Sequence, residues 1–296
     1  MKNILLYSLL FIVVLLLTSV FFTISPAMYK NVKNKHKQLD KVLLIGHRGA
    51  AGLAPENTIP SIDSAFTYDV DRVEVDIFQS KDNRVIVCHD ETIDRTTDGK
   101  GLIKDYTFSE LQEFDAGIWF SDDFKGTKLP SLDESFAAVD SKADFIIELK
   151  DGSPEYPDIE KNTLDLIHKY KATEWSIIHS FDDIILEKLL ELKADVPVHK
   201  LFSIKIAILP IMLDKKWHFG TIGNYDKYEE ISVYYKFVTP WMINKVHKMG
   251  KPINVWTVND PKIAKRLLNM GVDGIITNRP DLMKPIIDDF NKNIVK

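Results

Sequence analysis

Two histidines stand directly after apolar runs that predict buried strands. His47 follows the run over residues 42–46, and His89 follows the run over 84–88. A single histidine at a strand end is structural more often than not, but two in equivalent positions favour a shared function. Because the ordinary pKa of imidazole lies near neutral pH, such a pair can act as general base and general acid. We interpret His179, in another predicted strand, as a core or supporting residue.

Three carboxylates also stand in predicted strands. Glu74 and Asp76 lie two residues apart in the strand expected over 72–78, so their side chains point to one face. Glu148 lies in the strand expected over 144–149. Carboxylates among valines and isoleucines are costly to bury without a counter-charge, and a hard divalent cation would neutralise them. The alternative is that Glu74 and Asp76 face solvent from an edge strand.

Cations and an aromatic side chain accompany these acids. Lys150 follows Glu148 by two residues, and Arg48 follows His47. Together with a metal ion, the two cations favour an anionic substrate, typically a phosphate. The alternative for Glu148 and Lys150 is a surface ion pair. Trp256 could line a pocket against the carbon skeleton of a polyol, or it could belong to the core.

The elements that must position these groups alternate between short apolar runs and amphipathic stretches. Strands are predicted over 42–46, 72–78, 84–88, 144–149, 176–179, 197–202, 253–257 and 273–277. Helices are predicted over 59–68, 109–115, 131–140, 159–171, 182–193, 239–249 and 260–270. Eight strands separated by crossovers favour an α/β fold with a parallel TIM (β/α)8 barrel, whose C-terminal strand ends meet at one mouth. An open doubly wound sheet is the alternative, but no G-x-G-x-x-G follows the first strand.

Two stretches fit this pattern poorly. Residues 90–130 are long, polar and glycine-containing, and we expect them to form an inserted subdomain or lid after the third strand. Residues 203–235 resist assignment, although an additional strand near 231–235 fits their pattern.

The N-terminal region differs in composition from the rest of the chain. Residues 4–24 form an uncharged apolar run that is long enough to cross a bilayer. We predict an N-terminal transmembrane helix within a membrane anchor over residues 1–27, because no good signal-peptide cleavage site follows. Residues 28–40 then form a lysine-rich linker, and residues 41–290 form the barrel domain. We expect a single-pass protein of the cell membrane with an extracytoplasmic barrel, although the lysines after the span favour the opposite orientation.

Composition excludes several classes of function. The 296 residues carry 38 Lys plus Arg and 43 Asp plus Glu, a net charge of −5, without the cation clusters that nucleic acid binding requires. The single cysteine, Cys88, excludes an internal disulfide and a thiolate zinc cluster. A hydrophobic share of 45 % supports the core of a large domain.

Taken in order, these motifs resemble the glycerophosphodiester phosphodiesterase family. The matching segments are His47-Arg48-Gly49, Pro55-Glu56-Asn57-Thr58, Glu74-x-Asp76, His89-Asp90, Glu148-x-Lys150, Ser180-Phe181, Trp256-Thr257-Val258-Asn259 and Ile275-Ile276-Thr277-Asn278. Each motif alone is weak, but eight in the same order are specific, and they cover about residues 42–285. The resemblance implies a TIM barrel with a small insertion after the third strand.

The resemblance also implies roles for the residues above. His47 and His89 would be the acid–base pair, and Glu74, Asp76 and Glu148 would bind the metal cofactor, Ca²⁺ or Mg²⁺.

Four further residues are implied to bind the substrate. Arg48 and Lys150 would contact the phosphate, Glu56 would lie close to the metal or substrate, and Trp256 would form part of the pocket wall. Asn278 departs from the aspartate that many members of the family carry, at a position peripheral to the chemistry.

The implied activity is metal-dependent hydrolysis of glycerophosphodiesters to sn-glycerol 3-phosphate and an alcohol, a reaction of lipid and glycerol metabolism. The nucleophile is either water or the glycerol 2-hydroxyl, and either histidine could be the base. Substrates could extend to lysophospholipids, as in a lysophospholipase D, or to glycerophosphate polymers. Two alternatives are a phosphoinositide-cleaving phospholipase C and a catalytically silent barrel that binds polyol phosphates at the membrane.

Overall fold

The computed structural model describes residues 39–205, 211–213, 217–219 and 225–294. The predicted anchor and nearly all of the predicted linker therefore lie outside the described residues. Within the described ranges, no helix combines the length and the apolar character that a membrane span requires.

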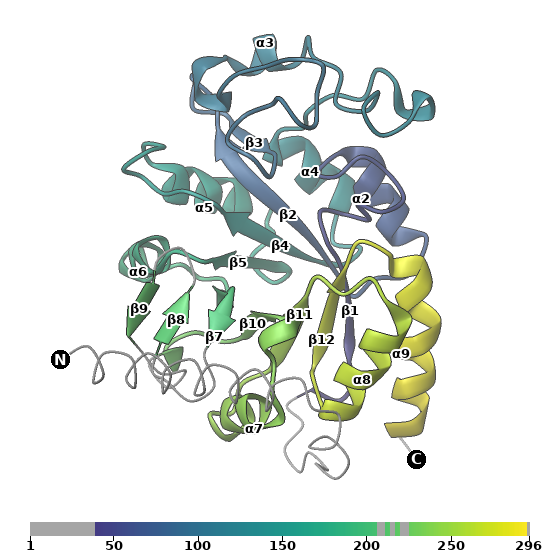
Figure 1. The fold of residues 1–296 in the computed structure, drawn as a ribbon. Coiled ribbons are helices and arrows are strands. Elements are labelled where there is room, and N and C mark those ends of the chain that lie inside the picture. The colour runs from purple at the N-terminus through teal and green to yellow at the C-terminus, as the bar shows by residue number, and fades with distance from the viewer. Residues whose placement is uncertain (1–38, 206–210, 214–216, 220–224, 295–296) are drawn as a thin grey trace, which may run out of the picture.

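Eight parallel strands close into a barrel, which confirms the predicted TIM fold and excludes the open sheet (Figure 1). In order around the ring, the strands are β1 (Leu43–Gly46), β2 (Arg72–Gln79), β4 (Asp144–Leu149), β5 (Ser176–Ser180), β6 (Val198–Phe202), β10 (Ile231–Tyr234), β11 (Ile253–Trp256) and β12 (Gly274–Thr277). The ring is closed because β1 pairs in parallel with both β12 and β2.

The number of barrel strands was predicted correctly, but one member was wrong. The run predicted over 84–88 forms β3 (Val85–Val87), which pairs antiparallel with β2 and lies outside the ring. The eighth place belongs to β10, which confirms the additional strand expected near 231–235. A short buried apolar run looks the same in a parallel and an antiparallel strand, so periodicity could not separate the two cases.

The insertion therefore follows the second barrel strand rather than the third. It runs from β3 through three short helical turns, η2 (Ile103–Asp105), α3 (Phe108–Leu111) and η3 (Asp122–Phe124). The helix predicted over 109–115 is reduced to the single turn α3, which a capping box of Thr107 and Glu110 starts. In Figure 1 the insertion lies at the top of the molecule, beyond the end of β2.

The outer layer consists of helices that follow the barrel strands. They are α2 (Ile59–Phe66), α4 (Leu132–Val139), α5 (Ile159–Lys169), α6 (Asp183–Glu191), α7 (Pro240–Lys248), α8 (Pro261–Met270) and α9 (Pro280–Ile294), with the turn η5 (Tyr235–Phe237) before α7. Pro240 and Pro261 occupy first turns, as their sequence context predicts. Helix α9 has no counterpart among the predicted helices, because Pro285 interrupts its pattern.

Between β6 and β10 the chain adds a small antiparallel sheet of β7 (Ile204–Lys205), β8 (Ile211–Leu213) and β9 (Trp217–Phe219). The main core lies between the barrel and its helices. A second, small apolar cluster fills the barrel interior and consists of Leu43, Ile45, Ile146, Ile177 and Ile276.

Candidate active site

The candidate active site lies on the C-terminal side of the interior apolar cluster, two residues further along the strands. Side chains two residues apart share a face of a strand, so the positions after the cluster also point inward. These positions are His47, Glu148, His179 and Asn278. The apolar cluster therefore forms the floor of a polar mouth at the C-terminal strand ends.

A cavity of about 220 Å³ opens at this mouth. Its lining residues are His47, Arg48, Glu74, His89, Glu148, Lys150, His179, Phe181, Leu201, Trp256, Thr257 and Ile276. Seven of the nine predicted site residues are among them, drawn from segments that are far apart in the sequence. Glu56 and Asp76 do not line the cavity and instead contact residues that do.

Both histidines are held through Nδ1. His47 Nδ1 lies 2.5 Å from Asn278 Oδ1, and His89 Nδ1 lies 2.6 Å from Asp90 Oδ1. Burial lowers the pKa of both imidazoles, although nearby carboxylates oppose this effect. With Nδ1 occupied, Nε2 of each ring is the nitrogen left to exchange a proton with a bound molecule.

Three buried donors are arranged to accept a metal ion. Ligand atoms of Glu74, Glu148 and His179 lie within 4.8 Å of one another. His179 Nε2 is 3.7 Å from both Glu74 Oε1 and Glu148 Oε2. Glu74 Oε1 and His179 Nε2 are buried without a hydrogen-bond partner among the described residues. Such unpaired atoms are costly, so two carboxylates and an imidazole fit a divalent cation well.

The acids of this cluster respond to burial in different ways. Desolvation raises the pKa of Glu148 to about 7, although Lys150 opposes the shift. Desolvation alone would also raise the pKa of Asp76, but Lys150 and Arg48 hold it well below its ordinary value. Of these two acids, Glu148 is the one whose charge depends more on a further cation.

Asp76 is fully buried and binds the two cations of the site. Its carboxylate lies 2.8 Å from Lys150 Nζ and 3.3 Å from Arg48 Nε. Asn57 donates a side-chain hydrogen bond of 2.8 Å to Oδ2 and accepts one of 3.1 Å from the Asp76 amide. Lys150 is also bound by Glu148 at 2.5 Å. The arrangement fixes both cations beside the cavity.

The glycine-rich loop after β1 carries Arg48 in a constrained backbone. Arg48 has φ 51°, its amide donates to Glu74 Oε2 at 2.8 Å, and its guanidinium binds Glu56 at 2.7 Å. Gly49 has φ 79°, and a Cβ there would lie 2.5 Å from the backbone of Ser61. Glycine is therefore required for the loop to turn against α2.

Two aromatic rings form an apolar wall of the cavity. The rings of Trp256 and Phe181 meet edge to face with centroids 5.4 Å apart, and Tyr234 packs on Trp256 at 5.3 Å. Trp256 also packs against the interior apolar cluster. Trp256 therefore both lines the cavity and packs on this cluster.

His179 lines the cavity as a candidate metal ligand, whereas the sequence predicted only a core or supporting role for it. The barrel register explains its position, because Asp76 pairs with Glu148, and Glu148 pairs with His179, across neighbouring strands. The signal available in the sequence was its place at the end of a predicted strand, two residues before Phe181.

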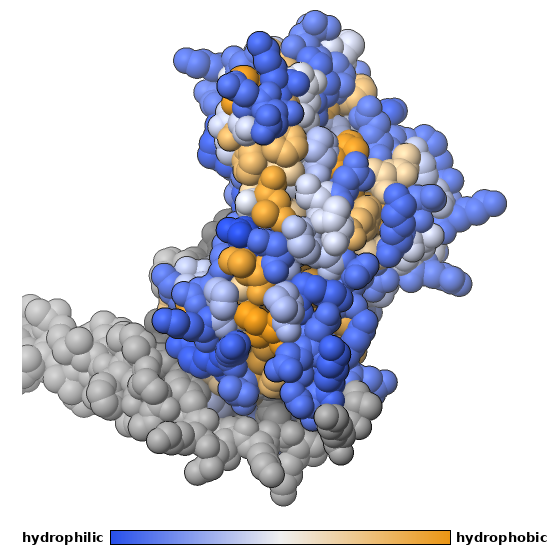
Figure 2. Space-filling model, turned by 90° about the vertical axis from the view of Figure 1, so that its right-hand side faces the viewer, coloured by the Kyte–Doolittle hydropathy of each residue, from blue (hydrophilic) through white to orange (hydrophobic). Residues whose placement is uncertain are grey.

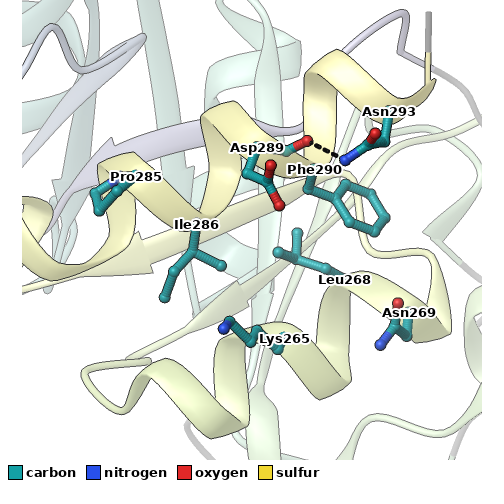
Figure 3. Close-up of a pocket in the computed structure, with 8 residues that line it drawn as sticks. All are labelled: Lys265, Leu268, Asn269, Pro285, Ile286, Asp289, Phe290 and Asn293. Atoms are coloured by element: carbon teal, nitrogen blue, oxygen red, sulfur yellow. Dashed lines mark hydrogen bonds between the residues drawn. The ribbon is translucent and has the colours of Figure 1, made fainter. Parts of the chain in front are cut away.

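A larger cavity of about 520 Å³ lies outside the barrel, between α8 and α9 (Figure 3). It is lined by Lys265, Leu268, Asn269, Pro285, Ile286, Asp289, Phe290 and Asn293. Figure 2 shows this side of the molecule, where apolar patches lie between hydrophilic residues. The groove brings together neither imidazoles nor several carboxylates, so its size does not make it the reactive site.

Comparisons with known proteins agree with this geometry. The model of the glycerophosphoryl diester phosphodiesterase family matches residues 47–282. The chain is 35 % identical to YhdW of Bacillus subtilis (strain 168), over 85 % of this chain and 99 % of that protein. It is 34 % identical to a glycerophosphodiester phosphodiesterase of Caldanaerobacter subterraneus subsp. tengcongensis, over 82 % and 96 %. An Oleispira antarctica phosphodiesterase, solved with its product sn-glycerol-3-phosphate, shares the fold with a TM-score of 0.72 at 24 % identity, over 83 % and 96 %.

Proposed function

The chain belongs to the glycerophosphoryl diester phosphodiesterase family, and on that premise we propose that the mouth cavity hydrolyses a glycerophosphodiester to sn-glycerol 3-phosphate and an alcohol. The observation that carries the proposal is the convergence of three imidazoles, two buried carboxylates and two cations on one cavity. A catalytically silent barrel would have no need to keep buried ionisable groups unpaired there.

Arg48 and Lys150 are proposed to bind the phosphate. Both line the cavity and both are positioned by Asp76. Guanidinium and ammonium groups match phosphate oxygens in charge and hydrogen bonding. The wall of Phe181 and Trp256 would pack against the carbon skeleton of the glycerol. A cavity of about 220 Å³ suits the glycerophosphate half of the substrate, so the alcohol would extend toward solvent.

A divalent cation, Ca²⁺ or Mg²⁺, is proposed as the cofactor. Glu74 and Glu148 would hold it, with His179 as the third donor from the protein and Asp76 as the predicted alternative. When bound, the cation would neutralise phosphate charge and supply Lewis-acid stabilisation of the charge that develops on the phosphoryl oxygens.

His47 and His89 are proposed as the acid–base pair. Asn278 and Asp90 orient the rings through Nδ1, which leaves Nε2 for proton transfer. One ring would take a proton from the nucleophile, and the other would donate a proton to the leaving alkoxide. Water and the glycerol 2-hydroxyl are both nucleophiles compatible with this arrangement. Only the second would produce a cyclic phosphate, so detecting that intermediate separates them.

The proposed function is tested by product analysis on a panel of substrates. Soluble glycerophosphodiesters, lysophospholipids and glycerophosphate polymers are incubated with the purified protein in Ca²⁺ or Mg²⁺, with and without a chelator. We expect chelator-sensitive release of sn-glycerol 3-phosphate from soluble diesters. Release from lysophospholipids would extend the substrate range to that of a lysophospholipase D. Absence of product from every substrate would contradict the proposal.

Attachment to the membrane through residues 4–24 stays a prediction. It is tested by comparing full-length protein with a variant that begins at Leu39 in membrane fractionation, and by protease protection of the barrel in intact cells. We expect only the full-length protein in the membrane fraction, with a protease-accessible barrel. Recovery of both forms in the soluble fraction would contradict the anchor.

A further inference from the structure

One arginine of the insertion connects two halves of the site. Arg95 lies in the segment after β3, and its backbone is anchored on both sides. The fully buried Ile93 donates its amide to Gly101 O at 3.0 Å, and the amide and hydroxyl of Thr97 donate to Ile93 O at 3.1 and 2.8 Å. The turn therefore presents the Arg95 side chain from a fixed position.

The guanidinium of Arg95 holds two carboxylates at once. It donates two hydrogen bonds to Glu56, at 2.9 Å to Oε2 and 2.7 Å to Oε1. Its Nε donates a third, of 2.6 Å, to Asp90 Oδ2. A planar guanidinium makes the bidentate pair and the further bond in one fixed geometry, whereas an ammonium group lacks this rigid fork of donors.

Each of these carboxylates holds a group proposed to act on the substrate. Asp90 uses its other oxygen, Oδ1, to orient His89 at 2.6 Å. Glu56 Oε1 also accepts from Arg48 at 2.7 Å. A continuous set of hydrogen bonds thus runs from His89 to Arg48 through Arg95. Arg95 is not among the residues that line the cavity, so it would act through its partners.

We propose that Arg95 is a positioning residue with two effects. It sets the orientation of His89 through Asp90, and it competes with Arg48 for hydrogen bonds to the Glu56 carboxylate. The inference rests on the proposed function of the mouth cavity. Without Arg95, the Asp90 carboxylate would lose the bond that fixes it, and the His89 ring would lose its defined orientation. Glu56 would be left with Arg48 as its charged partner, which would draw Arg48 away from the phosphate. Both changes misplace groups that must align with the reacting bond.

Arg84 is a matched control for Arg95. The two side chains are equally exposed, at 44 %, and each binds a buried or nearly buried carboxylate. The partner of Arg84 is Asp133, at 3.2 Å, and neither residue lines the cavity. We expect Arg95→Gln to lower kcat roughly 10–100-fold with a smaller rise in KM. Arg84→Gln should change kcat less than about two-fold, since it contacts neither half of the site.

Two further variants distinguish positioning from a general structural effect. Arg95→Lys keeps the positive charge but loses the bidentate bond to Glu56, so its kcat should lie between those of the wild type and Arg95→Gln. In a Glu56→Gln, Asp90→Asn background, Arg95→Gln should cause no further loss, because its partners can no longer be organised. An equal loss in both backgrounds, or an Arg95→Gln kcat equal to that of Arg84→Gln, would overturn the proposal.

The failure of this inference is separable from failure of the proposed function. Wild-type turnover is measured first, and its absence on all diesters contradicts the hydrolase proposal itself. If the wild type is active and Arg95→Gln has the same kcat, only the positioning role of Arg95 is contradicted. If Arg95→Gln does not fold, as judged by circular dichroism, Arg95→Lys carries the test, and wild-type kcat in that variant overturns the proposal.

Discussion

Buried ionisable side chains gather beside a cavity at each end of the barrel strands. At the C-terminal ends, Glu74, Glu148 and His179 surround a cavity. At the N-terminal ends, Arg72 and Glu230 belong to a group that also lines a cavity, of about 270 Å³. The two ends therefore share burial, charge and concavity, and differ in how their atoms are paired.

At the N-terminal end the charged atoms are paired with one another. Arg72 donates to Glu230 at 2.8 Å and to Asp144 at 3.3 Å, and Asn254 donates to Glu230 at 2.7 Å. His199 Nδ1 lies 3.4 Å from Glu230. Asn254 Oδ1 and, in the cavity lining, Ser176 Oγ are buried without a hydrogen-bond partner among the described residues, and both belong to neutral groups. Such a network stabilises the barrel and leaves no ionisable group in need of a ligand.

At the C-terminal end, the buried atoms without a hydrogen-bond partner among the described residues include two of ionisable groups that line the cavity, Glu74 Oε1 and His179 Nε2. The difference teaches that burial and charge alone do not identify a reactive site. Unpaired ionisable atoms around a cavity are what separate the end that binds a substrate from the end that holds the barrel together.

The strongest expected effect is on turnover. His47→Ala and His89→Ala should each lower kcat by about 10²–10⁴-fold, because each removes one proton-transfer group. Steady-state kinetics on a soluble diester measures this, with unfolding curves to show that stability is kept. Wild-type kcat in both variants would contradict the assignment of catalysis to the C-terminal end of the barrel.

The reverse pattern is expected at the other end. Glu230→Gln leaves Arg72 without its closest carboxylate and should lower the free energy of unfolding by about 3–5 kcal/mol. Its kcat per folded molecule should match the wild type. Urea denaturation gives the free energy of unfolding. Steady-state kinetics, divided by the folded fraction, gives kcat per folded molecule. A large loss of kcat with unchanged stability would mean that this end also takes part in catalysis.

His199 should make the N-terminal end sensitive to acid. Burial lowers its pKa to about 4 from the ordinary value of 6.5. Below pH 6.5 the unfolded chain binds a proton that the folded chain resists, so stability falls as pH drops toward 4. The full loss is on the order of 3 kcal/mol. Urea denaturation between pH 7 and 4 should show a shallower slope for His199→Asn, and an unchanged slope would contradict this assignment.

The smallest expected effect distinguishes the two candidates for the third metal ligand. If His179 coordinates the cation, His179→Ala should weaken Ca²⁺ or Mg²⁺ binding at least about 10–100-fold. Asp76→Asn should then weaken it less, since Asp76 already binds Lys150. Calorimetric titration of chelator-treated protein measures both. The opposite ranking would assign Asp76 to the metal and His179 to a supporting role.

The sequence predicted most of the mouth because strand alternation is local. Glu74 and Asp76 share a face by spacing alone, and His47 and His89 were identified by their places at strand ends. Which strands belong to the barrel was harder to predict, because the buried run of β3 resembles a barrel strand and β10 lies in an irregular stretch. His179 was missed because only the register of neighbouring strands places it beside Glu148. The contacts of Arg95 depend on how the insertion folds back, which no local pattern encodes.

The most direct test of the account follows the phosphorus atom itself. A ³¹P NMR time course of glycerophosphoethanolamine is recorded with wild type, His89→Ala and Glu230→Gln, each saturated with the divalent cation that supports the higher wild-type rate. We predict conversion to sn-glycerol 3-phosphate by wild type and Glu230→Gln, and a rate at least about 10²-fold lower for His89→Ala. No conversion by the wild type, or equal conversion by His89→Ala, would contradict this prediction.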